Sequence, residues 1–575
     1  MNNTHTDPGK VTRRMAAIIG VLAFGYVLYY FNYLETPSAD YMNNFLPRVM
    51  EYMKGTFPGN SFKILPVYNV LLALLTPLNP LDTFDPVYLT AIIVNLILFI
   101  PYLAVVWALY RRWLAAPYAL LAMLFLSANI YTVYTAINAE LEMLLTLLIA
   151  LTIYFTVKNS RWAYLTSWLA AGTKWDAVFT VPAAMYRDFF ENRKKIPAFI
   201  LGGLASTIAI SWILLSIYQR SSAGNHAYVG EIARRGPNIY MYFVDCYLVV
   251  SSFIAWMGTH IYYSDMFLLQ VVLALVLLVF AILVLVLLVW GGMLFIRLHW
   301  RKQVPLLLAT GGFLLVHVVY QNTKARYVLP ILWLLNLFLF YGLQQGLIPL
   351  IGKKWSAMNE THRKKLATIA FLSGLAVFTF ASSFTLLDAG ILPYAWALAF
   401  TAAGVITIRF TTGAGTHTIL ASALVFGILF SFMTGYGTRT MDHYSLRRVE
   451  FKKAGLWYRQ HGTPVDKMLI SETNVAMYYS GLERNRFIQS RELQSDTMQG
   501  VIKECTQKGI TLIFIDDFYI RRLKIGDKNA IMRNAATLKM IREKAADNPQ
   551  FFHIKTFTTG DDIKSQLYRF IPKRR

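Results

Sequence analysis

The sequence predicts an α-helical polytopic membrane protein with about 13 transmembrane helices, followed by a small extracytoplasmic α/β domain. Of the 575 residues, 56% are hydrophobic and only 15% are charged, which is typical of a multi-pass membrane protein. Apolar tracts near the roughly 20 residues that one span needs recur through most of the chain. The composition then becomes that of a soluble domain, so we expect a membrane domain over 1–438 and a second domain over 439–575.

Eleven apolar tracts are expected to cross the membrane, and they begin near Met15, Val87, Trp113, Leu141, Ile196, Met266, Val304, Tyr327, Leu366, Leu392 and Ile419. Lys and Arg gather in connections at 10–14, 111–112, 158–161, 187–195, 297–302 and 353–365, which the positive-inside rule places in the cytoplasm. For this alternation to hold, residues 162–186 must cross twice, as two short helices that turn at Thr173-Lys174-Trp175-Asp176. The N-terminus is then inside, and the C-terminal domain lies outside the cytoplasmic (inner) membrane.

The C-terminal domain alternates buried strands with amphipathic helices. Strands are predicted at 467–472 and 511–517, and helices at 447–461, 496–508 and 529–546. This order favours an α/β domain with a largely parallel sheet. Its 26 Lys/Arg and 15 Asp/Glu give a net charge of +11, which would attract anionic membrane lipids, whereas no pattern indicates nucleic-acid binding.

Two local features of the expected external regions carry weaker signals. Asp516 and Asp517 end the second strand and are interpreted as a solvated strand end or a helix cap. The two cysteines, Cys246 and Cys505, are both expected outside, where they could form a disulfide or remain unrelated thiols.

An acid lies just outside the first predicted span. Asp40 precedes a short amphipathic run, 41–54, that separates the first two apolar segments. A carboxylate fixed at the membrane surface suits a general base that acts on lipid-borne substrates. The alternative is that Asp40 only caps the helix that follows it.

Several cations lie where a membrane protein rarely places them. Lys63 opens the segment Lys-Ile-Leu-Pro-Val-Tyr, Lys174 lies at the predicted hairpin turn, and Lys324 and Arg326 start a span on the predicted external side. An anionic ligand explains basic residues on that side, and the planar fork of Arg326 suits phosphate. The alternatives are a snorkelling Lys63 and a self-neutralising ion pair between Lys174 and Asp176.

Two carboxylates, Glu140 and Glu142, open another apolar segment. Ionisable groups inside a membrane are functional candidates by default, here as a second acid or as substrate ligands. Their i, i+2 spacing predicts different helix faces, so one at most should face a cleft, and Glu140 is preferred. If both converged they could hold a divalent cation. The sequence identifies no certain cofactor and leaves a metal undecided.

In order and spacing over roughly 15–440, these motifs resemble those of the GT-C superfamily of membrane glycosyltransferases, closest to the protein O-mannosyltransferase and aminoarabinose lipid A transferase branches. The resemblance implies a polyprenyl-phosphate sugar donor and inverting transfer to an extracytoplasmic lipid, glycan or protein acceptor. It implies that Asp40 is the general base, and that the donor phosphate is bound by Lys63, Lys174, Lys324 and Arg326. The loop 218–265 would cover the donor site.

The chain departs from the family pattern at two places. Many members carry two adjacent acids where this chain has Asp40-Tyr41, and Leu65 replaces a proline of the lysine motif. These departures leave the role of a second acid open.

Two other classes of function are compatible with a polytopic chain. A transporter or flippase should carry midplane charges and internal repeats, and no repeat is found. An O-antigen ligase or polymerase usually has a large Arg/His-rich loop but no Asp after its first span. Asp40 therefore discriminates between these readings.

Overall fold

The computed structural model forms two compact units. The membrane unit comprises 1–31 and 48–441, and the C-terminal unit comprises 32–47 and 442–575. The structure describes residues 8–31, 33–34, 36–38, 40–57, 64–81, 83–223, 267–319, 328–412, 415–446, 448–523, 531, 534–559 and 563–572. The short connection after the first helix thus belongs to the same unit as the C-terminal domain.

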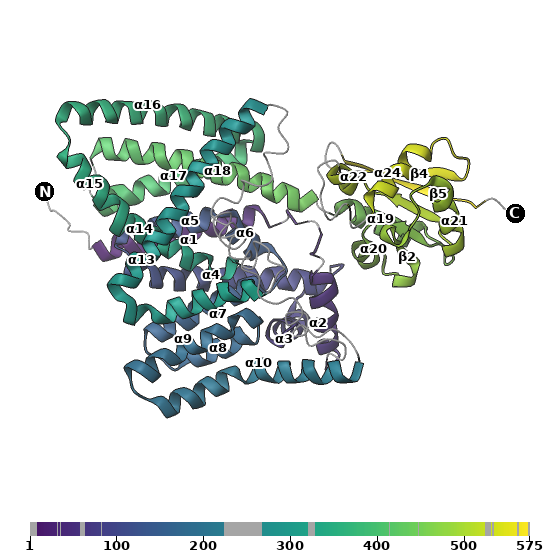
Figure 1. Cartoon of the computed structure of the whole chain (residues 1–575), viewed down its shortest axis with the longest axis horizontal. Coiled ribbons are helices and arrows are strands. Elements are labelled where there is room, and N and C mark those ends of the chain that lie inside the picture. Colours follow the sequence, from purple (N-terminus) through teal and green to yellow (C-terminus); the bar gives the residue numbers. More distant parts are fainter. Residues whose placement is uncertain are drawn as a thin grey trace. The chain divides into compact units, whose positions relative to one another are not determined.

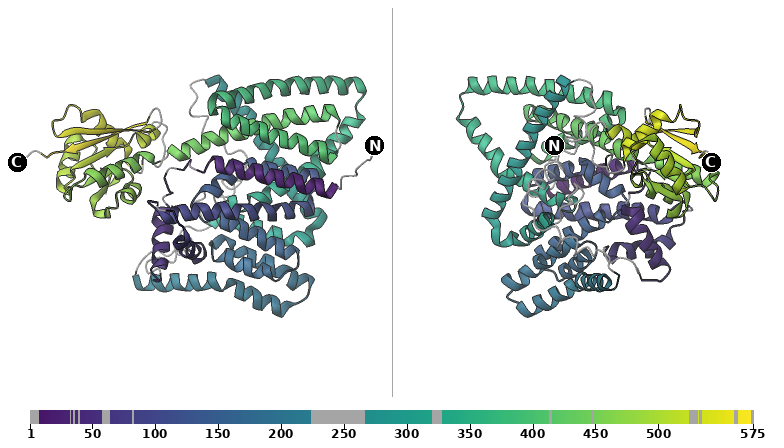
Figure 2. Two further views of the ribbon diagram at one scale, coloured as in Figure 1. Left: turned by 180° about the vertical axis from the view of Figure 1, so that it is seen from behind. Right: turned by 45° about the vertical axis from the view of Figure 1, so that its right-hand side comes forward.

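The membrane unit is built from helices (Figures 1 and 2). Its first half contains α1 (Pro8–Tyr29), α2 (Leu46–Met53), α3 (Pro66–Leu75), α4 (Pro86–Trp113), α5 (Ala116–Ala128), α6 (Ile130–Ile137), α7 (Glu142–Val157), α8 (Trp162–Ala171), α9 (Thr180–Tyr186) and α10 (Lys195–Ala223). Its second half contains α13 (Phe267–Val319), α14 (Leu332–Gly342), α15 (Ile348–Ala357), α16 (Glu360–Phe384), α17 (Ile391–Thr412) and α18 (Thr416–Leu446), which runs on into the C-terminal unit.

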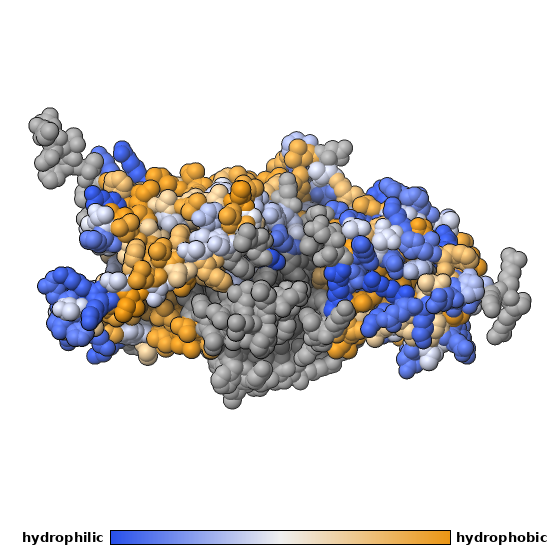
Figure 3. All heavy atoms as spheres, turned by 90° about the horizontal axis from the view of Figure 1, so that it is seen from above, coloured by the Kyte–Doolittle hydropathy of each residue, from blue (hydrophilic) through white to orange (hydrophobic). Residues whose placement is uncertain are grey.

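Within the described residues, eight helices are long and apolar enough to cross a membrane. The pair α5 and α6, bent by 59°, would make a ninth. Apolar side chains cover the outer surface of these helices (orange in Figure 3), as on α16, where Ile369 and Leu372 are exposed. The multi-pass helical class is confirmed, and the number of 13 crossings stays a prediction.

The predicted hairpin at 162–186 is present as α8, a turn at 172–174, a 3-10 helix η3 (Trp175–Phe179) and α9. The first arm, α8, contains 10 residues and reaches about 15 Å at 1.5 Å per residue, whereas the second arm is helical over 175–191, because η3, α9 and η4 (Arg187–Glu191) follow one another without a gap. The first arm alone does not span roughly 30 Å of hydrocarbon. The hairpin is therefore confirmed, whereas its double crossing stays a prediction.

The first helix is held by polar and aromatic contacts inside the membrane unit. The Tyr30 hydroxyl and the Thr438 Oγ1 lie 2.6 Å apart, which joins the end of α1 to α18. Tyr26 packs its ring against Trp396 and Phe400 of α17. Buried hydroxyls near hydrocarbon need such partners because no water can replace them.

The helix α13 differs from expectation. Two spans beginning near Met266 and Val304 were predicted, with a basic connection at 297–302, but the backbone is helical throughout Phe267–Val319. No Pro or Gly interrupts 297–302, and its one nearby proline is Pro305. Clustered charge alone therefore does not end this helix.

The helices α13 and α14 approach each other closely at two glycines. A Cβ on Gly291 would lie 1.9 Å from the Phe338 carbonyl oxygen, and one on Gly342 would lie 2.3 Å from the Leu287 carbonyl oxygen. Both obstacles are backbone atoms, so no side-chain rotation can relieve them. Small residues at such crossings let membrane helices pack without a hydrophobic driving force.

We expect Gly291→Ala to push α13 from α14 and to lower the stability of the full-length protein in detergent by about 1–3 kcal/mol. Gly292→Ala is the matched control, because a Cβ there meets nothing within 4 Å. Thermal unfolding of the purified variants measures the difference. Equal unfolding temperatures for both variants would contradict the close crossing.

The C-terminal unit contains a five-stranded mixed sheet, in the order β2 (Phe487–Gln489), β1 (Met468–Ile470), β3 (Leu512–Ile515), β5 (Ile563–Phe570), β4 (Phe551–Thr559). Its helices are α19 (Val449–His461), α20 (Thr473–Ser480), α21 (Met498–Lys508), α22 (Asp517–Leu523) and α24 (Ala535–Lys544). Both predicted strands and all three predicted helices are present. The sheet is parallel only from β2 to β3, because β3–β5 and β5–β4 pair antiparallel, so "largely parallel" was wrong.

Acids cluster in the core of this unit. Asp516 and Asp517 are buried rather than solvated: Asp516 Oδ1 accepts a 2.8 Å bond from the Tyr519 amide, and Asp517 pairs with Arg521 and Arg542. The helix-cap interpretation thus holds for Asp516, and the solvated alternative does not. Cys505 is a free buried thiol, and Cys246 lies outside the described residues.

Glu450 of α19 is the most unusual of these acids. It is buried and hydrogen-bonds to the Ser565 hydroxyl, which in turn accepts a 3.1 Å bond from the Asp517 amide. Burial, and then repulsion from Asp516, raises the pKa of Glu450 well above its ordinary value. The folded state therefore binds this proton more tightly than the unfolded chain does.

This shift predicts that Glu450 lowers the stability of its unit as pH rises from about 4.3, the ordinary Glu pKa, towards its raised pKa. The unfolded chain releases the proton in that window, while the folded chain retains it. Glu450→Gln should reduce this loss, measured by hydrogen exchange of α19 in the full-length protein at several pH values. Glu483→Gln, at an exposed position, should leave it unchanged. An identical pH dependence in wild type and Glu450→Gln would contradict the prediction.

Candidate functional site

The candidate base Asp40 lies half-buried at the start of η1 (Tyr41–Phe45), a single π-helical turn in the C-terminal unit. Its side chain makes no cap hydrogen bond; Ser38 Oγ instead accepts a 3.0 Å bond from the Tyr41 amide. Asp40 Oδ1 accepts a 3.2 Å bond from the Asn44 side-chain amide. Asp40 therefore occupies the N-cap position of η1 without a side-chain cap hydrogen bond, and the Tyr41 amide is satisfied by Ser38 instead.

The turn η1 is packed within the C-terminal unit. Tyr41 and Phe45 are buried, and η1 contacts α20. The acid consequently lies at the start of a short helix that the C-terminal unit supports. The expected helix over 41–54 is present as η1 followed by α2.

Three of the predicted phosphate-binding residues, Lys63, Lys324 and Arg326, lie outside the described residues. The neighbourhood of Lys63 is described from Ile64 onward. The Ile64 carbonyl accepts a 3.0 Å bond from the Trp212 indole of α10, and the Val67 amide donates a 3.1 Å bond to the Gly172 carbonyl. The start of α3 is thus fixed against the turn that carries Lys174.

Lys174 is the predicted phosphate ligand that the structure describes. Its ammonium lies 3.0 Å from an Asp176 oxygen and 6.0 Å from the centre of the Phe313 ring. The two charged side chains are only 15% and 7% exposed. The ion pair foreseen as the alternative is present, and such a pair offsets the cost of burying each charge. A phosphate would have to share this lysine with Asp176.

Glu140 and Glu142 are both buried, but they do not occupy one helix. Glu140 lies in a bend between α6 and α7, and Glu142 is the first residue of α7. The helical-spacing argument that separated them therefore does not apply. Tyr68, in the first turn of α3, lies within electrostatic range of both carboxylates, and Tyr88 lies within range of Glu140.

Asn95 of α4 holds the bend in place. Its side-chain amide donates bonds of 2.6 Å to the Asn138 carbonyl and 3.0 Å to the Glu140 carbonyl. These carbonyls have left the helical pattern in an apolar environment, where an unsatisfied group costs several kcal/mol. A single buried amide thus supports the backbone of the candidate acid.

The described residues bring the acid bend and the Lys174 turn to the same helix end. Val67 bonds to Gly172, two residues before Lys174, and the adjacent Tyr68 lies near both acids. The first turn of α3 therefore separates an acidic group from a basic one. This arrangement could orient a substrate that carries both hydroxyl and phosphate groups.

The candidate ligands around Glu140 and Glu142 do not form a metal-binding site. Within the described ranges, no three His, Cys, Asp or Glu side chains are grouped so that they could hold an ion. The pair Glu140 and Glu142 offers two carboxylates and no third ligand of these types. No step below depends on a metal.

Sequence reasoning missed Ser38, Tyr68 and Asn95, and also Arg48 of α2, which is buried in the membrane unit. Burial lowers the pKa of Arg48, with Glu51 and Tyr52 nearby. A basic residue inside the short amphipathic run was the only local signal for Arg48. The sequence also contained a local signal for Asn95, because a polar amide within a 28-residue apolar helix needs a hydrogen-bond partner.

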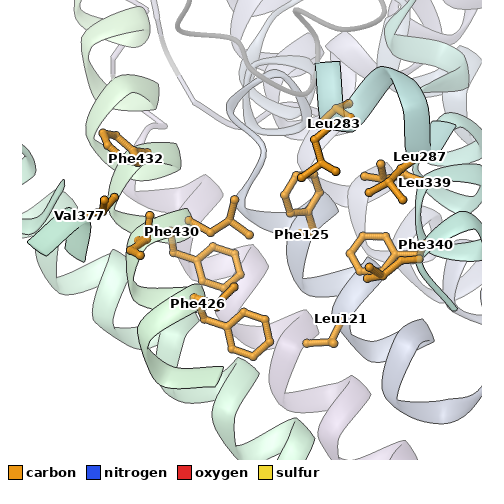
Figure 4. A pocket seen from close by; sticks show the side chains of 15 residues that line it. Leu121, Phe125, Leu283, Leu287, Leu339, Phe340, Val377, Phe426, Phe430 and Phe432 are labelled. Atoms are coloured by element: carbon orange, nitrogen blue, oxygen red, sulfur yellow. The ribbon is translucent and has the colours of Figure 1, made fainter. Parts of the chain in front are cut away.

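One described hydrophobic cavity, of about 360 Å³, offers no chemistry of its own (Figure 4). Phe426 and Phe430 of α18 face Phe125 of α5 and Phe340 of α14 across it, and its lining is entirely apolar side chains. Such a cavity can accommodate hydrocarbon and cannot stabilise phosphate.

The fold defines a multi-pass helical membrane protein with a C-terminal α/β domain. Comparison of the sequence finds no matching family model and no matching curated protein. Solved structures do match. One is ArnT from Cupriavidus metallidurans bound to undecaprenyl phosphate, and the match covers 99% of each chain at 13% identity and a TM-score of 0.51.

A second match is the apo oligosaccharyltransferase of Archaeoglobus fulgidus, at 9% identity and a TM-score of 0.50. This match covers 98% of the present chain and 74% of the oligosaccharyltransferase. At such identities the likeness establishes the fold alone. The resemblance to GT-C enzymes that the sequence indicated is confirmed at that level.

Replacing Asn95 tests the support of the acid bend. Asn95→Leu should destabilise the full-length protein by about 1–3 kcal/mol, because the buried Glu140 carbonyl loses the Asn95 amide, whereas the Asn138 carbonyl keeps a 2.8 Å bond from the Glu140 amide. Asn95→Asp, which keeps the size but loses the amide, should also destabilise it. The control is Ile97→Ala at an exposed position of the same helix. Wild-type unfolding temperatures for both Asn95 variants would exclude this role.

Proposed function

We propose that this protein is a glycosyltransferase that moves a sugar from a polyprenyl-phosphate carrier to an extracytoplasmic lipid, glycan or protein, with inversion. The observation that carries the proposal is a fold shared over 99% of both chains with ArnT, which was solved bound to undecaprenyl phosphate. In this proposal the domain boundary lies near residue 438, and the active site and the C-terminal domain are extracytoplasmic.

Asp40 is proposed as the general base. The cap role is taken by Ser38, and the Asn44 amide orients one carboxylate oxygen. The base would remove the acceptor proton while the bond between the anomeric carbon and the carrier phosphate breaks. A single displacement of this kind needs no covalent enzyme intermediate, because a neutralised phosphate is already a competent leaving group.

The carrier phosphate is proposed to be neutralised by Lys174 together with Lys63, Lys324 and Arg326. What supports this is the position of Lys174, half-buried in an interhelical turn that is bonded to the start of α3, and α3 begins three residues after Lys63. Asp176 would hold the lysine side chain in place before the donor binds. Glu140 and Glu142 are proposed to bind hydroxyl groups of a substrate.

Asp40→Asn tests the mechanism. General-base catalysis contributes about 10²–10⁴-fold, so turnover should fall by that range while binding of undecaprenyl phosphate stays near wild type. Turnover is followed as release of polyprenyl phosphate from a panel of synthetic polyprenyl-phosphate sugars.

Asp85→Asn is the matched control. Asp85 caps α4 through a 2.9 Å bond from the Tyr88 amide, and Asn caps helices equally well, so activity should be retained. Wild-type turnover in Asp40→Asn would remove Asp40 from the mechanism.

A further inference from the structure

A small polar pocket lies at the end of α7, α8 and α9, remote from the site described above. Its volume is about 80 Å³, and it is formed by two connections, 158–161 and 192–194, together with η4 (Arg187–Glu191). Its charged lining residues are Arg161, Arg187, Asp188 and Lys194. Three cations therefore share this pocket with one acid.

The two connections are locked to each other by side-chain bonds. The Asn192 amide donates 2.9 Å bonds to Asn159 Oδ1 and to Asp188 Oδ1, and the Lys194 amide donates 2.7 Å to the Asp188 carbonyl. Asn159 and Arg193 both have positive φ, at 56° and 55°, which lets each connection turn sharply after a helix. These hydrogen bonds and sharp turns therefore fix the shape of the pocket.

The charges in the pocket divide into two kinds. The guanidinium of Arg187 already has partners in the protein. It donates 2.8 and 2.6 Å bonds to the Thr156 and Val157 carbonyls at the end of α7, and a 2.7 Å bond to Glu191. Asp188 accepts from the Tyr164 hydroxyl at 3.0 Å and from Asn192.

Arg161 and Lys194 are different, because both are exposed at the pocket mouth and have no ion-pair partner within the part of the chain that the structure describes. Two cations are therefore available to an anion. Asp188 accepts its bonds from neutral groups and keeps its negative charge, but Arg161 and Lys194 leave the lining of the pocket with a net positive charge.

Exposed aromatic side chains near the pocket indicate its level relative to the membrane surface. Trp162, Phe190 and Phe199 are 60%, 64% and 61% exposed. Lys158 and Lys195 lie over the rings of Tyr154 and Phe189, at 5.8 and 5.7 Å from the ring centres. Aromatic rings with adjacent Lys and Arg mark the level of lipid head groups in membrane proteins.

We propose that this pocket binds the phosphate of an anionic phospholipid. Its volume of about 80 Å³ leaves room for a group of the size of a phosphate. The planar fork of Arg161 can hold two phosphate oxygens, and Lys194 adds a point charge. The acyl chains would lie along the exposed apolar face of α10, over Phe199 and Leu204.

This site is separate from the proposed donor site. Trp162 begins α8 and Lys174 follows its end, so the ten residues of the helix place the two ends roughly 15 Å apart. Basic pockets between helices on the predicted cytoplasmic side are typical lipid-binding sites. The inference does not depend on the glycosyltransferase proposal.

Native mass spectrometry of the full-length protein in detergent tests the site with phosphatidylglycerol and phosphatidylcholine of identical chains. Wild type should retain phosphatidylglycerol preferentially. The double variant Arg161→Gln/Lys194→Gln should weaken that binding on the order of tenfold. The control Lys353→Gln/Lys354→Gln, which removes the same charge from the exposed helix α15, should bind as wild type does.

Three results would overturn the proposal. They are an equal loss in the control variant, no preference for phosphatidylglycerol in wild type, and equally tight binding of inorganic phosphate, which would indicate a site for a soluble anion. If the double variant did not fold, Arg161→Lys would decide, because it keeps the charge and should weaken binding by losing the fork.

Discussion

The membrane unit depends on one constraint: every backbone polar group that leaves a helix in apolar surroundings must find a partner in the protein. The bend between α6 and α7 is satisfied by the Asn95 amide, and the end of α8 by the Val67 amide. Each break costs a specific buried donor, so breaks are few. Glu140 and Lys174 lie at two of them, which explains why ionisable groups and irregular backbone occur together here.

Local patterns in the sequence predicted much of this architecture. The turn at Thr173–Asp176 was predictable because a Lys and an Asp interrupt an otherwise apolar stretch, and the strands at Met468–Ile470 and Leu512–Ile515 because short apolar runs end in polar residues. The continuous α13 was not predicted, because a cluster of Lys and Arg resembles a loop whether or not the backbone stays helical. The β4–β5 hairpin was missed because its exposed positions obscure the strand pattern.

Long-range partners were beyond what the sequence could predict. Nothing near Asn95 indicates that its amide meets carbonyls 43 and 45 residues away. The cap is a subtler case, since Ser38 and Asp40 are both good capping residues and only the backbone geometry decides between them. The candidate acids were found from residue type, whereas their supports required the fold.

The position of Asp40 has a consequence for the C-terminal domain. A general base must be held within about an ångström of the reacting proton, so the element that carries it must be rigid. Asp40 precedes η1, which continues into α2, and the two together are short for a helix that is to be stable alone. Its rigidity comes from the burial of Tyr41 and Phe45 and from contact with α20 of the soluble domain. If Asp40 is the base, the rigidity of its position depends on packing within the C-terminal unit.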